Sequence, residues 1–224
     1  ARHIRKRSDH KITIISAETD YFFSRTALMY VYMGHMKFEN IKPYEDNFWP
    51  KNRIELKRAF VELIDSDNNQ LKLSGGELFK YDDLIIACGS KPNKFGWPGQ
   101  DLQGVQGLYS WQDLESMEEN TKGIQRAVIV GGGLIGVEMA EMLLSRGIAV
   151  TFLVREKRFW GSVLPKEEGE LISRHIKSHH VDLRFETELE EILAGPNGKV
   201  EKVKTKNGEI IECQFVGLTA GVSP

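Results

Sequence analysis

The chain has 224 residues, 41% of them hydrophobic and 28% charged, and its formal net charge is −2. This length predicts one large or two small domains at roughly 150 residues each, and the near-neutral charge gives no electrostatic basis for binding nucleic acid. No apolar run approaches the ~20 residues that cross a bilayer, and no signal peptide is visible, so we expect no transmembrane segment. The two cysteines, Cys88 and Cys213, fit neither a metal spacing nor a CxxC pattern, and a reducing, cytoplasmic setting is the default expectation.

The first elements form a recognisable series. Residues 1–7 have the character of the end of a helix, and residues 11–15 (KITII) form a short apolar strand. Turn residues at 67–69 and 75–76 then predict a hairpin. The apolar segment YDDLIIACG follows, and we expect a buried strand that ends at Gly89.

The second half of the chain contains a similar series. A strand at 126–130 leads into the glycine loop 131–136, a helix over 135–146 and a second strand at 150–154. Turns at 196–198 and 207–208 predict another hairpin, followed by a buried strand that ends at Gly221.

The two series are copies of one unit. NGEIIECQFVGLTAGVSP aligns with GGELFKYDDLIIACGSKP at a shift of 132 residues, and the strands around Thr13 and Thr151 align at a shift of 138. The glycine loop of the first copy would then precede residue 1, so we expect the chain to be cut at both ends. The fold class is α/β, with two Rossmann-like domains, parallel sheets and β-meander insertions. We place the domains at 1–110 and 111–224, with the boundary between about Pro98 and Lys122.

The glycine loop GGGLIG matches the G-x-G-x-x-G pattern between an apolar strand and an apolar helix. Gly131 permits the tight turn, Gly133 lets a pyrophosphate approach the backbone, and Gly136 lets helix and strand pack closely. The N–H groups and the dipole of the helix attract the phosphate charge. The alternative is a tight turn with only a structural role.

Two charged residues follow the second strand of this unit. An acid at this position binds the ribose of NAD, whereas an arginine accommodates the 2′-phosphate of NADP. Here Arg155 and Glu156 lie side by side in LVREKR. The motif therefore indicates a nicotinamide cofactor without deciding between the two, and both residues could instead be solvated surface charges.

Four segments resemble the FAD-dependent pyridine nucleotide–disulfide oxidoreductase superfamily, and the resemblance covers essentially the whole chain. They are YDDLIIACGSKP, VIVGGGLIGVEMAEML, EKRFWGSVLP and VGLTAGVSP. The branch they resemble holds ferredoxin and rubredoxin reductases, nitrite-reductase-like flavoproteins and apoptosis-inducing-factor-like proteins.

The resemblance implies FAD in the first domain and NADH or NADPH in the second, with NADH favoured because Glu156 matches an acid that serves NADH. For FAD it implies contacts from six residues: Glu18, Arg25, Val61, Ala87, Cys88 and Gly89. For the nicotinamide nucleotide it implies the loop Gly131, Gly133 and Gly136, with Arg155, Glu156, Ala220 and Gly221. Glu138 would lie beside the nicotinamide and the flavin, as the catalytic residue.

The chain departs from the family in three ways. The FAD pyrophosphate loop and a late Gly-Asp motif are absent, no cysteine occurs at 24–34, where disulfide reductases keep theirs, and Tyr30 replaces a lysine that usually partners Glu138. The second departure excludes dithiol chemistry.

These features predict a flavoprotein oxidoreductase that passes a hydride from NAD(P)H to FAD. Electrons then leave for a ferredoxin-, rubredoxin- or nitrite-reductase-type protein, a quinone or oxygen. The alternative is a redox-sensing NAD(H)- and FAD-binding regulatory protein with slow turnover. A homodimer is compatible with either. The pair His175 and His179 lacks an acidic third ligand in the sequence pattern, so we expect no metal site.

Overall fold

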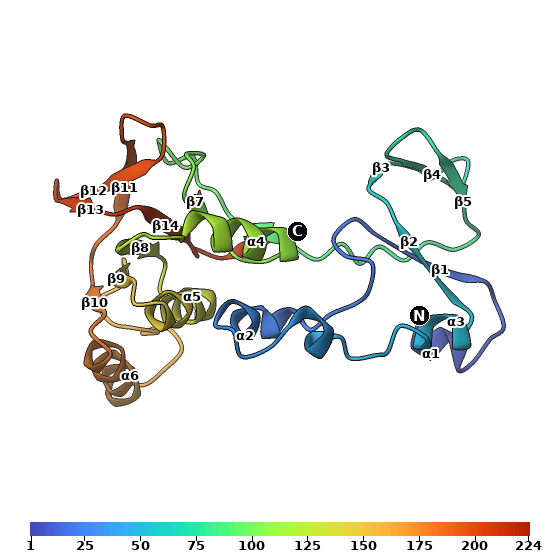
Figure 1. Ribbon diagram of the computed structural model, residues 1–224, viewed down its shortest axis with the longest axis horizontal. Helices are drawn as coiled ribbons and strands as arrows, with labels where there is room; N and C mark the ends of the chain where they lie inside the picture. Colours follow the sequence, from blue (N-terminus) through green and yellow to red (C-terminus); the bar gives the residue numbers. More distant parts are fainter. The chain divides into compact units, whose positions relative to one another are not determined.

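The computed structural model describes residues 1–224 as two compact units (Figure 1). One unit comprises residues 1–27 and 36–88, and the other comprises residues 28–35 and 89–224. The domain boundary expected near residue 110 stays a prediction.

The helices are short, and none combines the length and apolar character needed to cross a membrane. They are α1 (Arg2–Arg5), α2 (Leu28–Tyr32), α3 (Phe48–Lys51), α4 (Trp111–Asn120), α5 (Leu134–Ser145) and α6 (Lys166–Ser178), with 3₁₀ turns at Arg25–Ala27 and Phe38–Ile41. The strands of the first unit are β1 (Ile12–Ser16), β2 (Ile54–Arg58), β3 (Val61–Asp65), β4 (Gln70–Leu73) and β5 (Leu78–Lys80). Those of the second are β6 (Lys91–Pro92), β7 (Val105–Gln106), β8 (Arg126–Val130), β9 (Ala149–Leu153), β10 (Asp182–Arg184), β11 (Leu189–Ala194), β12 (Val200–Thr205), β13 (Ile210–Glu212), β14 (Phe215–Leu218) and β15 (Val222–Ser223).

The first unit contains a parallel pair and an antiparallel meander. Strand β1 pairs in parallel with β2, from Ile12 opposite Ile54 to Ser16 opposite Arg58. Strands β3, β4 and β5 form the meander. The turns expected at 67–69 and 75–76 connect its strands, so the predicted hairpin is confirmed.

The buried strand expected before Gly89 is wrong. Residues 84–88 adopt no regular secondary structure, and Ile85 and Ile86 are 72% and 65% exposed. An isolated strand leaves its backbone N–H and C=O groups unpaired. Strand β1 pairs only with β2, and residues 84–88 join no sheet. The apolar composition alone therefore does not produce a strand here.

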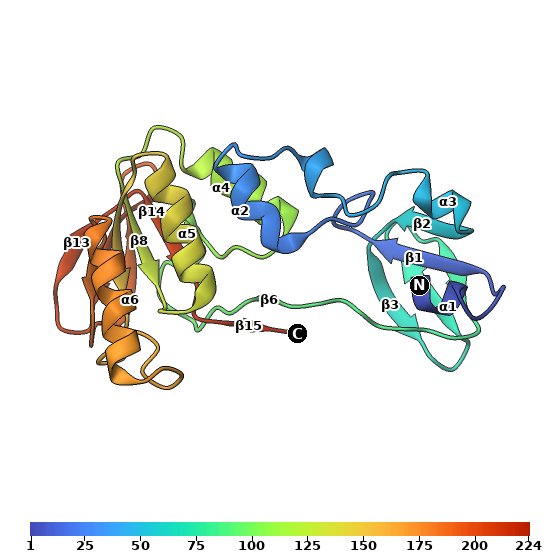
Figure 2. The same ribbon diagram turned by 90° about the horizontal axis from the view of Figure 1, so that it is seen from below.

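The second unit is built on a five-stranded sheet in the order β10-β9-β8-β14-β7. Every neighbouring pair is parallel. The predicted strand at 126–130 coincides with β8, the predicted helix at 135–146 corresponds to α5, and the strand at 150–154 corresponds to β9. These elements form the βαβ unit expected from the sequence, and Figure 2 shows α5 beside β8 and β14. Figures 1 and 2 together confirm the mixed α/β class.

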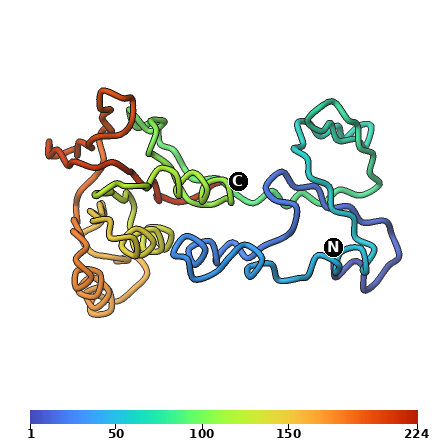
Figure 3. The backbone as a smooth tube through the Cα atoms, viewed as in Figure 1, coloured from blue at the N-terminus to red at the C-terminus, as the bar shows by residue number.

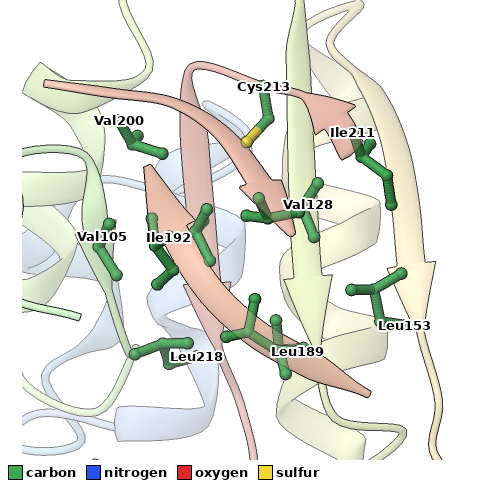
Figure 4. Packing of buried hydrophobic residues seen from close by; sticks show 12 residues of the cluster. Val105, Val128, Leu153, Leu189, Ile192, Val200, Ile211, Cys213 and Leu218 are labelled. Carbon is green, nitrogen blue, oxygen red and sulfur yellow. The ribbon is translucent and has the colours of Figure 1, made fainter. Parts of the chain in front are cut away.

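A meander and a helix cover the two faces of this sheet. The antiparallel strands β11, β12 and β13 pack against one face, with Ile192 and Val200 in the same buried cluster as Val105, Val128 and Leu218 of the sheet (Figure 4).

Cys213 lies in this cluster, and burial raises the pKa of its thiol to about 12. On the other face, a Cβ on Gly217 of β14 would come within 2.2 Å of the sulfur of Met139, so helix α5 packs directly on the strand. The sheet is therefore packed against other elements on both faces.

Helix α2 belongs to the second unit because its last residue is anchored there. Tyr32 is buried, its hydroxyl lies 2.7 Å from Thr121 Oγ1, and the guanidinium of Arg146 lies 3.6 Å from its ring centroid. Arg146 also pairs with Glu118 of α4 at 2.6 Å. The tube in Figure 3 shows the coils of α2 and α5 near each other. These contacts join α2, α4 and α5 into one layer.

Candidate functional site: the glycine loop and its surroundings

The carboxyl ends of β8 and β14 define the candidate site. In the sheet, β9 is the neighbour of β8 on one edge and β14 is its neighbour on the other edge. The connection that leaves β8 leads to β9, so the strand order reverses at β8. In open parallel sheets ligands bind at such a topological switch point. The glycine loop 131–136 follows β8 here, and residues 219–221 follow β14.

Gly131 and Gly136 are required by close backbone packing. Gly131 has a φ of +111°, and a Cβ there would lie 2.9 Å from the carbonyl oxygen of Thr219. A Cβ on Gly136 would lie 2.6 Å from the carbonyl oxygen of Gly131 and 2.8 Å from both Thr219 Oγ1 and the ring of Phe152. Any side chain at Gly136 would therefore push α5 away from the loop.

Gly133 differs, because space surrounds it. It is the N-cap of α5, with φ −85° and ψ 178°, and a Cβ would meet only the Thr219 carbonyl oxygen, at 3.7 Å. The N–H groups of the first helical turn have no partners within the helix and attract anions. With 12 residues, α5 has a full dipole directed at this point. The open backbone fits a pyrophosphate.

Thr219 is a site residue that the sequence analysis missed. Its Oγ1 lies 3.0 Å from the carbonyl oxygen of Val130 and 2.9 Å from that of Gly131, and its N–H donates to Val130 at 2.9 Å. The side chain is buried. A polar residue ending the apolar run VGLTAG was the available signal, but only the fold brings it to the loop 88 residues earlier.

Ala220 and Gly221, predicted to close the nucleotide site, continue from Thr219. A Cβ on Gly131 would lie 3.0 Å from the backbone nitrogen of Ala220. Gly221 has a φ of +96°, and its carbonyl accepts the N–H of Asn93 at 3.0 Å. The structure thus brings the glycine loop and residues 219–221 together, while their contact with a nucleotide stays a prediction.

Arg155 and Glu156, the candidate ribose residues, follow β9 and pair with each other. Arg155 Nε lies 2.9 Å from Glu156 Oε1, and this bond raises the pKa of the guanidinium. The backbone carbonyl of Glu156 accepts the N–H of Glu186 at 3.1 Å. The Glu156 side chain is 46% exposed, so its second oxygen is accessible to a ribose hydroxyl.

A basic hollow begins at the residue after Glu156. It has a volume of about 290 Å³, and its lining comprises Lys157, Arg158, Glu170, Ser173, Arg174, Lys177 and Phe185. Four of the seven residues are cationic, and the one carboxylate, on Glu170, lies 3.7 Å from Lys166. The hollow is therefore strongly positive beside the candidate ribose position.

Glu138, the predicted catalytic residue, lies in the second turn of α5 and is half-buried. Burial raises the pKa of its carboxyl, and the neighbouring charge of Glu141 raises it further. Buried acids with raised pKa values are enriched at functional sites.

Glu18 and Arg25, predicted to contact FAD, form an ion pair in the first unit. Arg25 Nη1 and Nη2 donate to the two carboxylate oxygens of Glu18 at 2.8 and 2.7 Å. Glu18 follows β1, where an acid can bind an adenosine ribose in this type of fold. The two hydrogen bonds fix the orientation of the carboxylate, which suits binding to the two ribose hydroxyls. These residues therefore fit one end of a flavin nucleotide.

The other predicted FAD residues lie at the start of β3 and at residues 87–89. Val61 begins β3 and is half-buried, whereas Ala87 and Cys88 are exposed in the irregular segment. Gly89 has a φ of +70°, and a Cβ there would lie 2.5 Å from the hydroxyl of Tyr109. Their contact with a flavin stays a prediction.

Comparison with known proteins identifies relatives along the whole chain. The family model described as pyridine nucleotide-disulphide oxidoreductase matches residues 1–224. The nitrite reductase [NAD(P)H] of Bacillus subtilis is 27% identical over 219 residues, covering 97% of this chain and 27% of that protein. A ferredoxin–NAD(P)(+) reductase of a Sphingomonas species is 30% identical over 219 residues, covering 95% of this chain and 52% of the relative.

A solved structure shares the fold. The ferredoxin reductase from Rhodopseudomonas palustris superimposes with a TM-score of 0.89 at 21% identity, covering 99% of this chain and 55% of its own. This likeness confirms the expected Rossmann-like architecture. The chain spans about a quarter of the nitrite reductase and about half of each of the other two.

Proposed function

The chain belongs to the pyridine nucleotide-disulphide oxidoreductase family, and from that premise we propose that it is part of an oxidoreductase that takes a hydride from NAD(P)H. The observation that carries the proposal is the open N–H end of α5 at Gly133, placed at the switch point of a parallel sheet. The names of the ferredoxin and nitrite reductases among its relatives include NAD(P), in agreement with this site.

The residues of the second unit have distinct parts in binding. Gly133 and the first turn of α5 hold the pyrophosphate, and Glu156 accepts hydrogen bonds from the adenosine ribose. Glu138, in the second turn of the same helix, lies beside the nicotinamide and contributes the charge of its carboxyl. Since α5 packs directly on β14 through Gly217, the start of this helix and Glu138 are held in place before the nucleotide arrives.

In the first unit the Glu18–Arg25 pair, Val61, Ala87 and Cys88 hold FAD. When bound, the nicotinamide supplies the hydride and the flavin accepts it, and the protein contributes position and electrostatics. NADH is the favoured donor in this proposal, and NADPH is an additional one.

Dithiol chemistry is excluded from the proposal. Residues 22–38 contain no cysteine. Of the two cysteines elsewhere, Cys88 is exposed, and Cys213 is buried with a thiol pKa of about 12. A thiol with that pKa is not ionised at neutral pH and is not a nucleophile. The electrons therefore pass outward, to a small redox protein such as a ferredoxin or rubredoxin, to a quinone or to oxygen.

The test is a titration of the purified protein. It should show a flavin absorbance that anaerobic NADH bleaches, and it should oxidise NADH rapidly when ferredoxin, rubredoxin or a quinone is added. Glutathione, lipoamide and coenzyme A disulfides should not be reduced. A protein that binds no FAD on reconstitution contradicts the proposal, and slow reduction with no acceptor-dependent turnover would favour the redox-sensing alternative.

A further inference from the structure

Trp160 has an unusual backbone conformation beside the glycine loop. It lies between β9 and α6, directly after the fully buried Phe159, and its φ is +50°. A bulky residue in the left-handed region is rare, and such residues cluster at functional sites. Its carbonyl accepts the N–H groups of Val163 and Leu164, each at 2.9 Å, so the turn is closed around this conformation.

The side chain of Trp160 binds the loop itself. The indole Nε1–H donates to the carbonyl oxygen of Gly132 at 2.6 Å, across 28 residues of sequence. Behind Gly132, a Cβ would meet Val154 at 3.1 Å and the ring of Phe159 at 3.6 Å. The rings of Phe159 and Trp160 lie 5.2 Å apart. The middle of the loop therefore lies against an apolar wall and is held to it by one polar bond.

This bond determines which way the next N–H points. The carbonyl of Gly132 and the N–H of Gly133 belong to one planar peptide, and no peptide in the chain is cis. In a trans peptide the two groups point in opposite directions. When the indole holds the Gly132 carbonyl, the Gly133 N–H must point away from Trp160. That N–H is at the open N-cap of α5, the position that fits a pyrophosphate.

The Gly132–Gly133 peptide needs such a restraint. Glycine has access to many backbone conformations, so a peptide between two glycines reverses easily. In the reversed orientation it would present a carbonyl oxygen to the phosphate charge, which is repulsive. A donor that satisfies the Gly132 carbonyl stabilises the orientation that binds phosphate.

We propose that Trp160 is a positioning residue that holds the Gly132–Gly133 peptide in the orientation that binds the nucleotide pyrophosphate. The inference rests on the proposed function, because it assumes that the loop binds NAD(P)H. It concerns only the phosphate-bearing part of the ligand, so adenosine, which has no phosphate, should not depend on the indole N–H.

The experiment compares Trp160→Phe, which keeps an aromatic ring and removes the N–H, with the control Trp97→Phe, which makes the same chemical change against the buried cluster of the meander. Kd values for ADP-ribose and for adenosine are measured by calorimetry on the flavin-loaded protein. The loss of one hydrogen bond should raise the Kd for ADP-ribose roughly two- to tenfold in Trp160→Phe. The Kd for adenosine should stay unchanged, and both values should stay unchanged in the control.

Steady-state kinetics supply the second measurement. The KM for NADH should rise by the same factor as the ADP-ribose Kd, while kcat at saturating NADH stays within twofold. If Trp160→Phe does not fold, Trp160→Gly, which suits the positive φ, provides the same comparison of ADP-ribose with adenosine.

If the Trp160 variant binds ADP-ribose and adenosine with equally reduced affinity, or binds both with wild-type affinity, the proposed role of Trp160 is wrong. A wild-type protein that binds no ADP-ribose and oxidises neither NADH nor NADPH would overturn the proposed function instead.

Discussion

Thr219 Oγ1 lies 2.9 Å from the carbonyl oxygen of Gly131, so a single hydroxyl joins the end of β14 to the turn that follows β8. The nearly isosteric substitution Thr219→Val removes this bond and leaves the Gly131 carbonyl without that donor. Leaving a buried acceptor unpaired costs about 1–3 kcal/mol, and because this bond is part-buried the loss should lie toward the lower end. We expect a lower Tm and a several-fold higher KM for NADH, measured by calorimetry and initial rates. Thr219→Ser, which keeps the hydroxyl, should restore most of both values, and an unchanged Thr219→Val would show that the bond has no influence on the loop.

Two glycines of the loop, Gly136 and Gly133, should respond differently to substitution by alanine. In Gly136→Ala the new Cβ would lie 2.6 Å from a backbone oxygen, so we expect a large loss of stability, seen as a lower denaturation midpoint in urea. Gly133 has φ −85° and no atom closer than 3.7 Å to a Cβ, so Gly133→Ala should fold normally.

The methyl group in Gly133→Ala would nevertheless occupy the space that fits the pyrophosphate. We expect a wild-type unfolding curve together with at least tenfold weaker binding of ADP-ribose, which corresponds to about 1.4 kcal/mol. Wild-type affinity in this variant would mean that the pyrophosphate binds elsewhere.

The raised pKa of Glu138 should make the stability of the protein depend on pH. Its carboxyl has a pKa above the ordinary value of 4.5, chiefly because of burial, so the folded protein binds this proton more tightly than the unfolded chain does. The contribution of Glu138 to the free energy of unfolding is therefore most favourable below the pKa of the unfolded chain. It is lost as the pH rises through the pKa of the folded protein. Glu138→Gln, which is neutral at every pH, should raise Tm at neutral pH and leave it unchanged near pH 4.

If Glu138 also lies beside the nicotinamide, the same variant should have a lower kcat. Gain of stability with loss of activity is typical of a strained functional residue. Glu141→Gln on the same helix is the matched control, since it removes the neighbouring charge without removing the proposed catalytic carboxyl. A Glu138→Gln variant with full activity would exclude a catalytic role.

The elements that the sequence predicted well are those whose signals are local. The strand at 126–130, the glycine turn and helix α5 are adjacent in the chain, and each is recognisable from composition and periodicity within a few residues. The turn residues at 75–76 and 207–208 likewise predicted a hairpin in each half of the chain, and the glycines there have positive φ in the structure.

The elements that could not be predicted depend on distant partners. Residues 84–88 have the composition of a buried strand, yet a strand forms only beside another, and pairing is not written in a local pattern. Thr219 and Trp160 contact the glycine loop from 88 and 28 residues away. Their residue types are ordinary, and only the folded chain shows their polar atoms directed at the loop.

Cofactor preference depends on the pair that follows β9. Glu156 can accept hydrogen bonds from both ribose hydroxyls of NADH, whereas the 2′-phosphate of NADPH would place a negative charge against its carboxylate. Loss of a bidentate contact costs on the order of 1–3 kcal/mol, or roughly tenfold to a hundredfold in affinity. Glu156→Ala should therefore weaken the binding of NADH and reduce the difference in affinity between NADH and NADPH.

The cations around Glu156 act in the opposite direction. Arg155 pairs with Glu156 at 2.9 Å and reduces its repulsion of a phosphate, and the hollow lined by Lys157, Arg174 and Lys177 would attract one. Because the ion pair is exposed and worth little by itself, Arg155→Ala should leave kcat/KM for NADH nearly unchanged. Arg174→Glu, which reverses one charge of the hollow, should lower kcat/KM for NADPH alone. The measurement is the ratio of kcat/KM for NADH to kcat/KM for NADPH in the wild type and in these variants. If the wild type prefers NADPH and Arg155→Ala loses that preference, then the arginine and not the acid selects the cofactor.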